Sequence, residues 1–131
     1  MVHAVQSGHP GGSLGCTEYF TALYFDIMKH DPKFNMDGTG EDIFFLSNGH
    51  ISPVFYSAHE DLPGVRIASG SLGQGMSVAV GAALAKKLNN DDRIVYSLHG
   101  DGELDEGQNW EAIMFAAHKK VDNLIATIDH N

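Results

Sequence analysis

The chain contains few of the residues on which disulfide-rich, nucleic-acid-binding or membrane-spanning proteins depend. Cys16 is the only cysteine in 131 residues, so no internal disulfide can form and a reducing compartment is expected. Eight Lys and Arg against 17 Asp and Glu give a net charge of −9, which argues against binding nucleic acid or anionic membranes. No stretch approaches the roughly 18 apolar residues of a membrane-spanning helix, and no signal-peptide pattern opens the chain. We therefore expect a cytoplasmic protein with no nucleic-acid or membrane partner.

What is present predicts one globular domain of the α/β class. The chain is 43% hydrophobic and long enough to bury a core. Apolar runs typical of buried strands alternate with segments of helical periodicity, which predicts a mostly parallel central sheet flanked by helices. The expected strands are 42–46, 93–98 and 124–128, the expected helices are 17–28, 76–88 and 104–120, and Ser52-Pro53 could begin another helix.

The most informative stretch is Gly100-Asp101-Gly102, read together with Asn131. A strand precedes the first glycine, and a helix and a second strand follow, which makes a βαβ unit with parallel strands. If those strands are neighbours, Asp101 and Asn131 emerge at the same edge of the sheet, where α/β proteins bind ligands. A carboxylate and an amide oxygen suit Mg²⁺, and Gly102 would let a phosphate approach the backbone N–H groups. The pattern predicts a metal-diphosphate site.

A simpler interpretation of these residues remains open. Gly-Asp-Gly can be only a turn between strand and helix, with Asp101 or Asp105 capping the helix.

Three further loops that contain glycine, Ser7–Gly12, Ser47–His50 and Gly70–Gly75, are expected near the same edge. The first is expected to be a rigid loop, because Pro fixes φ and the glycines allow unusual backbone angles. Two of these loops carry a histidine beside glycine, although a lone histidine is more often structural than functional.

Five short motifs in this order resemble transketolase, and together they extend over nearly the whole chain. They are SGHPGG (7–12), LSNGH (46–50), LPGV (62–65), GSLGQG (70–75) and GDGELDEGQNWE (100–111). The resemblance is to the N-terminal domain, which binds the diphosphate of thiamine diphosphate in a three-layer α/β fold. Transketolases transfer a two-carbon ketol unit between sugar phosphates with thiamine diphosphate and a divalent metal, so the resemblance implies Mg²⁺, or Ca²⁺ or Mn²⁺, as a second cofactor.

The resemblance also implies roles for particular residues. Asp101 and Asn131 would bind the metal, and the Gly102 N–H would bind the diphosphate. Cofactor-lining positions would be His50, Gly70, Ser71 and Leu72. His9 resembles the catalytic histidine that faces the substrate. Glu106 resembles a buried glutamate that couples two active sites across a dimer interface, with Glu111 as a possible neighbour, although an acid stabilised by the positive end of a helix is an equal alternative for Glu106.

The sequence also departs from the family. Between Tyr56 and Leu62 it is shorter than transketolases, which suggests that residues 1–131 form an N-terminal domain lacking a loop near 57–59. His59 lacks the flanking Gly and Pro of the family's second substrate histidine. Because the family's cofactor lies between this domain and a pyrimidine-binding one, we expect a partner in the form of a C-terminal domain or subunit. We also expect self-association, and negligible activity of the chain alone.

Three alternatives stay open at this point. Dihydroxyacetone synthase and deoxyxylulose-phosphate synthase use the same cofactor chemistry. A non-catalytic subunit that keeps the cofactor-binding fold belongs to a different functional class. Metal-dependent cofactor binding, and its loss on replacing Asp101 or Asn131, separates a cofactor-binding chain from one in which these residues only form a turn.

Overall fold

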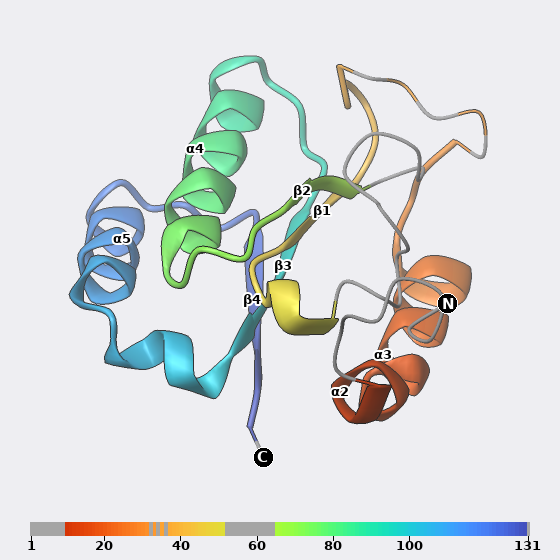
Figure 1. Ribbon diagram of the computed structural model, residues 1–131. Helices are drawn as coiled ribbons and strands as arrows, with labels where there is room; N and C mark the ends of the chain where they lie inside the picture. The colour runs from red at the N-terminus through yellow and green to blue at the C-terminus, as the bar shows by residue number, and fades with distance from the viewer. Residues whose placement is uncertain (1–9, 32, 34, 36, 52–64, 131) are drawn as a thin grey trace.

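The computed structural model describes residues 10–31, 33, 35, 37–51 and 65–130 (Figure 1). His9, Asn131 and the helix expected from Ser52 lie outside the described residues. The described elements, in chain order, are α2 (Pro10–Gly15), α3 (Thr17–Ala22), the π-helix η1 (Leu23–Ile27), β1 (Ile43–Leu46), β2 (Val65–Ala68), α4 (Gln74–Leu88), β3 (Val95–Gly100), the 3₁₀-helix η3 (Asp101–Asp105), α5 (Gly107–His118) and β4 (Leu124–Asp129).

The described strands form one parallel sheet in the order β2-β1-β3-β4. Strands β3 and β4 pair along their whole length, from Val95 with Leu124 to Gly100 with Asp129. The prediction that these two strands are parallel is therefore confirmed, and they are neighbours, which is the condition for bringing the residues after them to one edge. Because parallel strands share one direction, the carboxyl ends of β1, β3 and β4 lie at the same edge, as expected for a ligand site.

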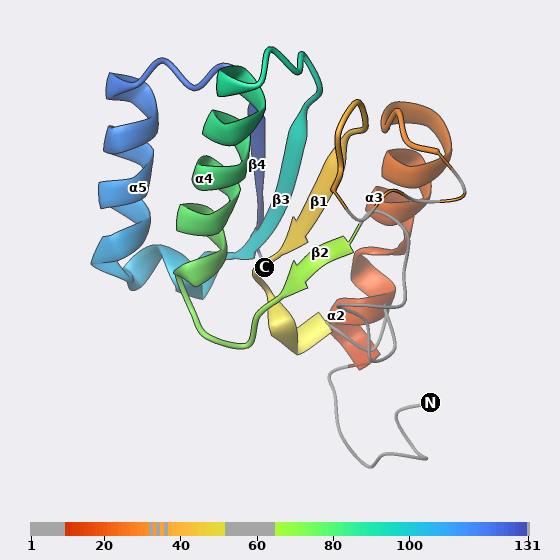
Figure 2. The same ribbon diagram turned by 90° about the horizontal axis from the view of Figure 1, so that it is seen from above.

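Helices cover both faces of the sheet, which confirms the three-layer α/β architecture (Figure 2). Side chains alternate along each strand, so β1 and β3 supply apolar groups to both faces. On one face the strands pack against α3 and η1, and on the other against α4, while α5 packs beside α4. The first cluster includes Phe20, Leu23, Phe44, Leu46, Tyr96 and Leu98; the second includes Ile43, Phe45, Ala79, Ala83 and Val95; the α4–α5 contact includes Met76, Val80 and Ala112.

Two local expectations were wrong, and one strand was not predicted. The loop expected over 7–12 is helical from Pro10, where proline is favoured because the first turn of a helix needs no N–H from it. The helix expected from Leu104 begins at Gly107, since 101–105 form a 3₁₀-helix first. The four-residue strand β2 was missed, because Val65–Ala68 has an arginine in its middle and is too short for a periodic pattern.

At the amino-terminal ends of the strands, opposite the edge formed by their carboxyl ends, the buried Asp42 carboxylate joins two segments. It accepts hydrogen bonds from the backbone N–H of Lys29 at 2.8 Å and of Ile94 at 2.9 Å. A buried carboxylate satisfied in this way holds the chain before β1 against the start of β3. It lies at the end of the sheet away from the strand carboxyl ends.

Lys86, near the end of α4, is buried and fully paired. Its Nζ donates to the carbonyl oxygens of Gly38 and Glu41 and to Asp91 Oδ2, all at 2.7 to 2.8 Å. Burial alone would raise the pKa of Asp91, but the hydrogen bonds from Lys86 and two backbone N–H groups bring that pKa below its ordinary value.

None of the helices in the described residues is both long and apolar enough to cross a membrane.

Candidate functional site

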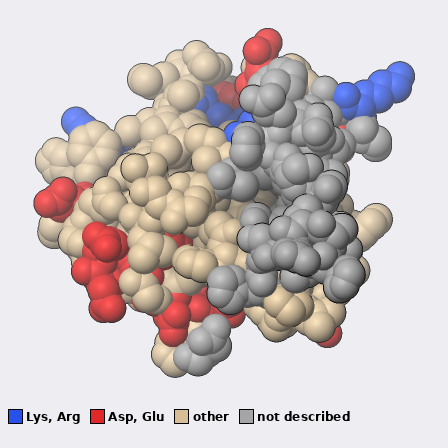
Figure 3. Space-filling view, in the orientation of Figure 1, with Lys and Arg blue, Asp and Glu red and all other residues tan. Residues whose placement is uncertain are grey.

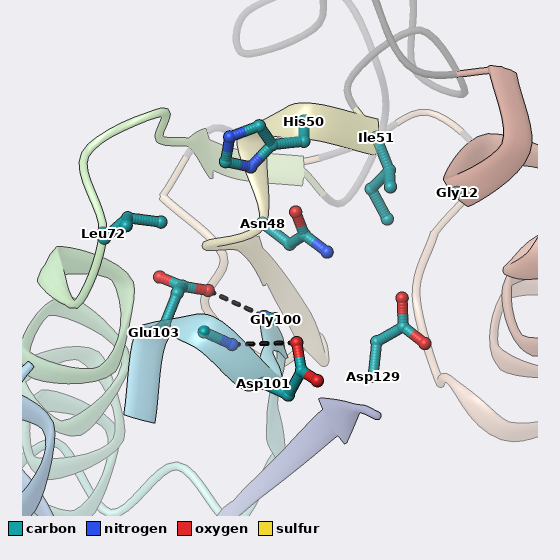
Figure 4. Close-up of a pocket in the computed structure, with 10 residues that line it drawn as sticks. Gly12, Asn48, His50, Ile51, Leu72, Gly100, Asp101, Glu103 and Asp129 are labelled. Carbon is teal, nitrogen blue, oxygen red and sulfur yellow. Dashed lines mark hydrogen bonds between the residues drawn. The ribbon is translucent and has the colours of Figure 1, made fainter. Parts of the chain in front are cut away.

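A pocket of about 330 Å³ lies at the carboxyl edge of the sheet (Figure 4). It opens where β1, β3 and β4 end, and α2 and the glycine-rich loop before α4 close its sides. This is the position at which open α/β sheets bind ligands. The described residues that line it are Gly12, Asn48, His50, Ile51, Leu72, Gly100, Asp101, Gly102, Glu103 and Asp129.

The loop after β1 brings Asn48 and His50 to the pocket. The backbone N–H groups of Ser47 and Asn48 both donate to Leu98 O, at 2.9 and 3.3 Å, which bends the chain over the end of β3. A Cβ on Gly49 would lie 2.4 Å from Ser69 O, so only glycine lets this loop approach the loop before α4 so closely. Asn48 is buried, whereas His50 is exposed at the rim of the pocket.

The glycine-rich loop contributes Leu72 to the pocket. Gly73 has a positive φ of 82°, and Gln108 Nε2 of α5 donates to Leu72 O at 2.9 Å, which fixes the turn into α4. Ser71 N donates to Ser69 Oγ at 3.1 Å. Of the three expected cofactor-lining positions in this loop, Leu72 lines the pocket, and Gly70 and Ser71 are exposed beside it.

Asp101 stands directly after β3 at the start of η3. Its Oδ1 accepts a hydrogen bond from the N–H of Gly102 at 2.8 Å, so the backbone group expected to meet a diphosphate contacts the neighbouring carboxylate. Gly102 lines the pocket, and outside its own turn no described atom lies within 4 Å of the position that a Cβ on Gly102 would take. The backbone therefore faces the open pocket, as close approach by a phosphate requires.

Asp129, at the end of β4, adds a second carboxylate that sequence reasoning did not assign. The carboxylates of Asp101 and Asp129 come from neighbouring strand ends and lie on the same side of the pocket (Figure 4). Cys16 Sγ donates to Asp129 Oδ2 at 3.6 Å. Burial of Cys16, together with the charge of Asp129, raises the pKa of the thiol to about 11, which keeps it protonated.

The donor set fits a hard divalent cation bound with its own phosphate or water ligands. Among the described residues, no group of three His, Cys, Asp or Glu side chains could hold a metal by itself. Mg²⁺ usually takes one or two protein carboxylates and completes its octahedron with water and phosphate oxygens. Asp101 can supply such a carboxylate, and the pairing of Asp101 with Asn131 stays a prediction because Asn131 lies outside the described residues.

Glu103 is the buried centre of the site, and sequence reasoning did not single it out. Its side chain is 1% exposed, and its two oxygens accept hydrogen bonds from three different segments. Ser47 Oγ donates to Oε1 at 2.5 Å, the N–H of Gly73 to Oε1 at 2.9 Å, and the N–H of Gly100 to Oε2 at 2.8 Å. The carboxylate thus joins the loop after β1, the glycine-rich loop and the end of β3.

His99 lies beside this carboxylate inside the sheet. Its Nε2 is 2.9 Å from Ser97 Oγ, and its Nδ1 is 3.9 Å from Glu103 Oε2 without a hydrogen-bond partner among the described residues. Burial lowers the pKa of His99, although the charge of Glu103 opposes that shift. The imidazole is therefore neutral near pH 7.

Glu106 and Glu111 lie outside the pocket. Glu106 directly precedes α5, is exposed, and makes no side-chain hydrogen bond to cap that helix. Figure 3 shows Asp and Glu side chains gathered at the lower left, where η3 and the start of α5 lie in Figure 1. The exposed acids of this stretch are Asp105, Glu106 and Glu111. The interface role expected of Glu106 stays a prediction.

Some pocket residues had signals in the sequence that could have revealed them. Asn48 lies in a loop already expected at the site, and Asp129 is the last residue of a strand whose neighbour ends in Asp101. Glu103 stands three residues after Gly100, the spacing at which a glutamate turns back to a backbone N–H at the start of a helix. Gly12 likewise belongs to the stretch 7–12 expected at this edge, whereas Ile51, just past the expected loop 47–50, carried no such signal.

The sequence matches one family model over its whole length. The model describes the thiamine diphosphate binding domain of transketolase and matches residues 1–60 and 58–131. A 6-deoxy-6-sulfo-D-fructose transketolase subunit from Clostridium sp. (strain MSTE9) is 40% identical over 95% of this chain and 54% of its own length. An apulose-4-phosphate transketolase subunit from Phocaeicola vulgatus is 37% identical over 100% of this chain and 56% of its own length.

Solved structures give the same fold. Transketolase from Campylobacter jejuni superimposes with a TM-score of 0.83 at 36% identity, covering 99% of this chain and 26% of that one. Transketolase from Leishmania mexicana superimposes with a TM-score of 0.84 at 29% identity, covering 99% of this chain and 25% of that one. The chain therefore spans about half the length of the two subunits and about a quarter of the solved enzymes.

Proposed function

The chain belongs to the transketolase family through its thiamine diphosphate binding domain, and from this premise we propose that it is the N-terminal half of a transketolase. The proposed reaction transfers a two-carbon ketol unit from a ketose phosphate to an aldose phosphate. Thiamine diphosphate, when bound, supplies the carbanion chemistry that breaks and forms the C–C bond. The role of the protein is to bind the diphosphate, orient the cofactor and exclude water.

The observation that carries this proposal is the pocket at the carboxyl edge of the sheet. It combines a carboxylate for a dication, Asp101, with an open backbone at Gly102 and an apolar side chain at Leu72. That combination suits a ligand with an anionic end and a flat apolar part. With a net charge of −9 and no Lys or Arg among the described residues that line the pocket, a bound metal ion is favoured to offset the charge of a diphosphate here.

We assign roles within this proposal as follows. Asp101 and Asn131 bind Mg²⁺, with Ca²⁺ or Mn²⁺ as possible substitutes, and His50 at the rim contacts the diphosphate. Leu72, with Gly70 and Ser71 beside it, packs against the thiazolium region. His9 takes part in proton transfer with the sugar, a role in which histidine is the most frequent side chain.

The proposed partners are a second copy of this chain and a C-terminal pyrimidine-binding domain or subunit. The C-terminal partner follows from the premise, and similar proteins are named as transketolase subunits. Self-association is supported by apolar side chains on α5 that the described residues leave uncovered, because Trp110 is 52% exposed and Met114 is 64% exposed. Glu106, at the start of this helix, is proposed to lie in that interface.

Calorimetric titration of the chain with thiamine diphosphate tests the cofactor proposal. With Mg²⁺ present we expect saturable binding that chelation with EDTA abolishes. Asp101→Ala and Asn131→Ala should each remove the metal-dependent part, whereas the control Asp105→Ala, which changes an exposed carboxylate two residues beyond the pocket lining, should bind like wild type. Equal binding by Asp101→Ala and wild type would show that the metal assignment is wrong.

A ketol-transfer assay tests the catalytic proposal and separates the alternatives. The chain alone should give negligible turnover, and adding the candidate C-terminal chain with cofactor and metal should restore it. Donors should include fructose 6-phosphate, 6-deoxy-6-sulfofructose and apulose 4-phosphate, since the similar subunits are named for the last two. Acceptance of formaldehyde as the preferred acceptor would favour dihydroxyacetone synthase. Full turnover by the single chain would refute the half-site proposal, and cofactor binding without turnover on any sugar would favour a non-catalytic subunit.

A further inference from the structure

One buried carboxylate under the pocket makes more contacts than its position in a turn requires. Glu103 follows the Gly-Asp-Gly stretch, and its own carbonyl oxygen accepts a hydrogen bond from the buried Asn109 side chain. With main chain and side chain both fixed, its carboxylate points back beneath the pocket instead of outward to solvent (Figure 4).

The three groups that donate to this carboxylate all come from segments that line the pocket. Ser47 precedes Asn48 and His50, Gly73 follows Leu72, and Gly100 precedes Asp101. Each donor is thus next in sequence to a residue that lines the pocket. A shift of any donor would move its pocket-lining neighbour by a similar distance.

Only a side chain with hydrogen-bond acceptors at both oxygen positions, Oε1 and Oε2, can satisfy all three donors. Oε1 takes the hydroxyl of Ser47 and the N–H of Gly73, and Oε2 takes the N–H of Gly100. A glutamine would have the same shape, but its NH₂ group would face one of these donors and leave it unsatisfied. An unsatisfied buried donor is costly, so at least one of the three segments would move.

We propose that Glu103 is a positioning residue that holds the loop after β1, the glycine-rich loop and the end of β3 in the geometry needed to bind thiamine diphosphate and its metal. The inference rests on the proposed function and deepens it, since it names the group that fixes the cofactor pocket from below. Glu103 acts through Ser47, Gly73 and Gly100 and not on the reacting atoms.

The test compares Glu103→Gln with Asp42→Asn. Both replace a buried carboxylate that accepts backbone N–H bonds with its amide, but Asp42 lies at the opposite edge of the sheet. In the chain with its C-terminal partner, Mg²⁺ and thiamine diphosphate, we expect Glu103→Gln to weaken cofactor affinity by about tenfold or more. Asp42→Asn should leave that affinity within about twofold. Equal affinities in the two variants, at a temperature where both are folded, would overturn the proposal.

Amide hydrogen exchange by NMR provides a second measurement that needs no cofactor. In Glu103→Gln the amides of Gly73 and Gly100 should exchange faster than in wild type, and the increase should exceed that at Val95 in the middle of the sheet. An equal increase at all three amides indicates general destabilisation and overturns the proposal. If wild type binds no cofactor even with its partner, the proposed function fails, and the exchange measurement still decides whether Glu103 holds the loops.

Discussion

The contact between Gly75 and Ser47 gives the sharpest test of how the loops around the pocket are packed. A Cβ added at Gly75, the second residue of α4, would lie 2.3 Å from Ser47 Cβ and 2.4 Å from Ser47 Oγ. Ser47 cannot move aside freely, because it is fully buried and its hydroxyl donates to Glu103 at 2.5 Å. Overpacking costs about 1–3 kcal/mol, and disturbing a hydrogen bond to a charged group adds a comparable amount. We therefore expect Gly75→Ala to lower the free energy of unfolding by about 3 kcal/mol or more.

The same helix contains a matched control. Gly81 lies inside α4, is exposed, and has no described atom beyond its own stretch of helix within 4 Å of an added Cβ. Gly81→Ala should raise the free energy of unfolding by about 0.5–1 kcal/mol, because alanine loses less backbone entropy than glycine on entering a helix. The two substitutions are chemically identical, so opposite signs can arise only from their surroundings.

Urea unfolding followed by circular dichroism, with linear extrapolation to water, measures both variants. A double-mutant cycle with Ser47→Gly then isolates the side-chain contacts, since that change removes the Cβ and Oγ that the new methyl group would meet and leaves only Ser47 Cα, at 2.9 Å. In the Ser47→Gly background the cost of Gly75→Ala should be much smaller. If Gly75→Ala stabilises the chain as Gly81→Ala does, or if its cost is the same in both backgrounds, the close packing of these loops is refuted.

Three further predictions concern buried titratable groups. Lys86→Met should lower the free energy of unfolding, measured in urea at pH 7, by about 3 kcal/mol or more, because it leaves Asp91 without its buried cation. The pKa of Asp91 in the folded chain is below 3.8, so the difference in stability between variant and wild type should shrink as the pH falls below about 4. Native Cys16, 5% exposed and with a pKa of about 11, should resist iodoacetamide at pH 8 and react fully in urea, as mass spectrometry can show. Because the pKa of folded His99 is below its ordinary 6.5, wild type should lose stability from about pH 7 to 5.5 as the unfolded chain gains a proton, and His99→Gln should lose less over that range.

The parts of the fold that local patterns control could be predicted from the sequence. Strands β1, β3 and β4 are short apolar runs followed by turn residues, and α4 is an alanine-rich segment that ends before Asn89 and Asn90. The parallel direction of β3 and β4 followed from the helix between them, whereas their adjacency was only a condition of the predicted site, which the structure meets. These expectations needed no knowledge of distant contacts.

The missed elements depend on contacts that local patterns do not contain. Strand β2 exists because Val65–Ala68 pairs with β1, and its register with β1 shifts between Phe44 and Phe45. Helix α2 begins at Pro10, in a segment whose two glycines favour a loop when they are considered alone. For β2 the pairing with β1 decides the structure, whereas α2 has no buried residue and starts at a proline, which suits the first turn of a helix.

The contacts of the site are likewise of two kinds, local ones that the sequence predicts and distant ones that it does not, and Glu103 makes both. Its bond to the N–H of Gly100 spans three residues and follows from helix-start spacing. Its bonds to Ser47 and Gly73 span 56 and 30 residues, so they exist only because β1 lies next to β3 and because α4 starts beside both. A motif can therefore indicate which residues line the pocket, such as Asp101, but the carboxylate that we infer fixes their positions is found only after the strand order is known. For a pocket built from several loops, variants chosen from motifs alone would omit the carboxylate on which, by our inference, the loop geometry depends.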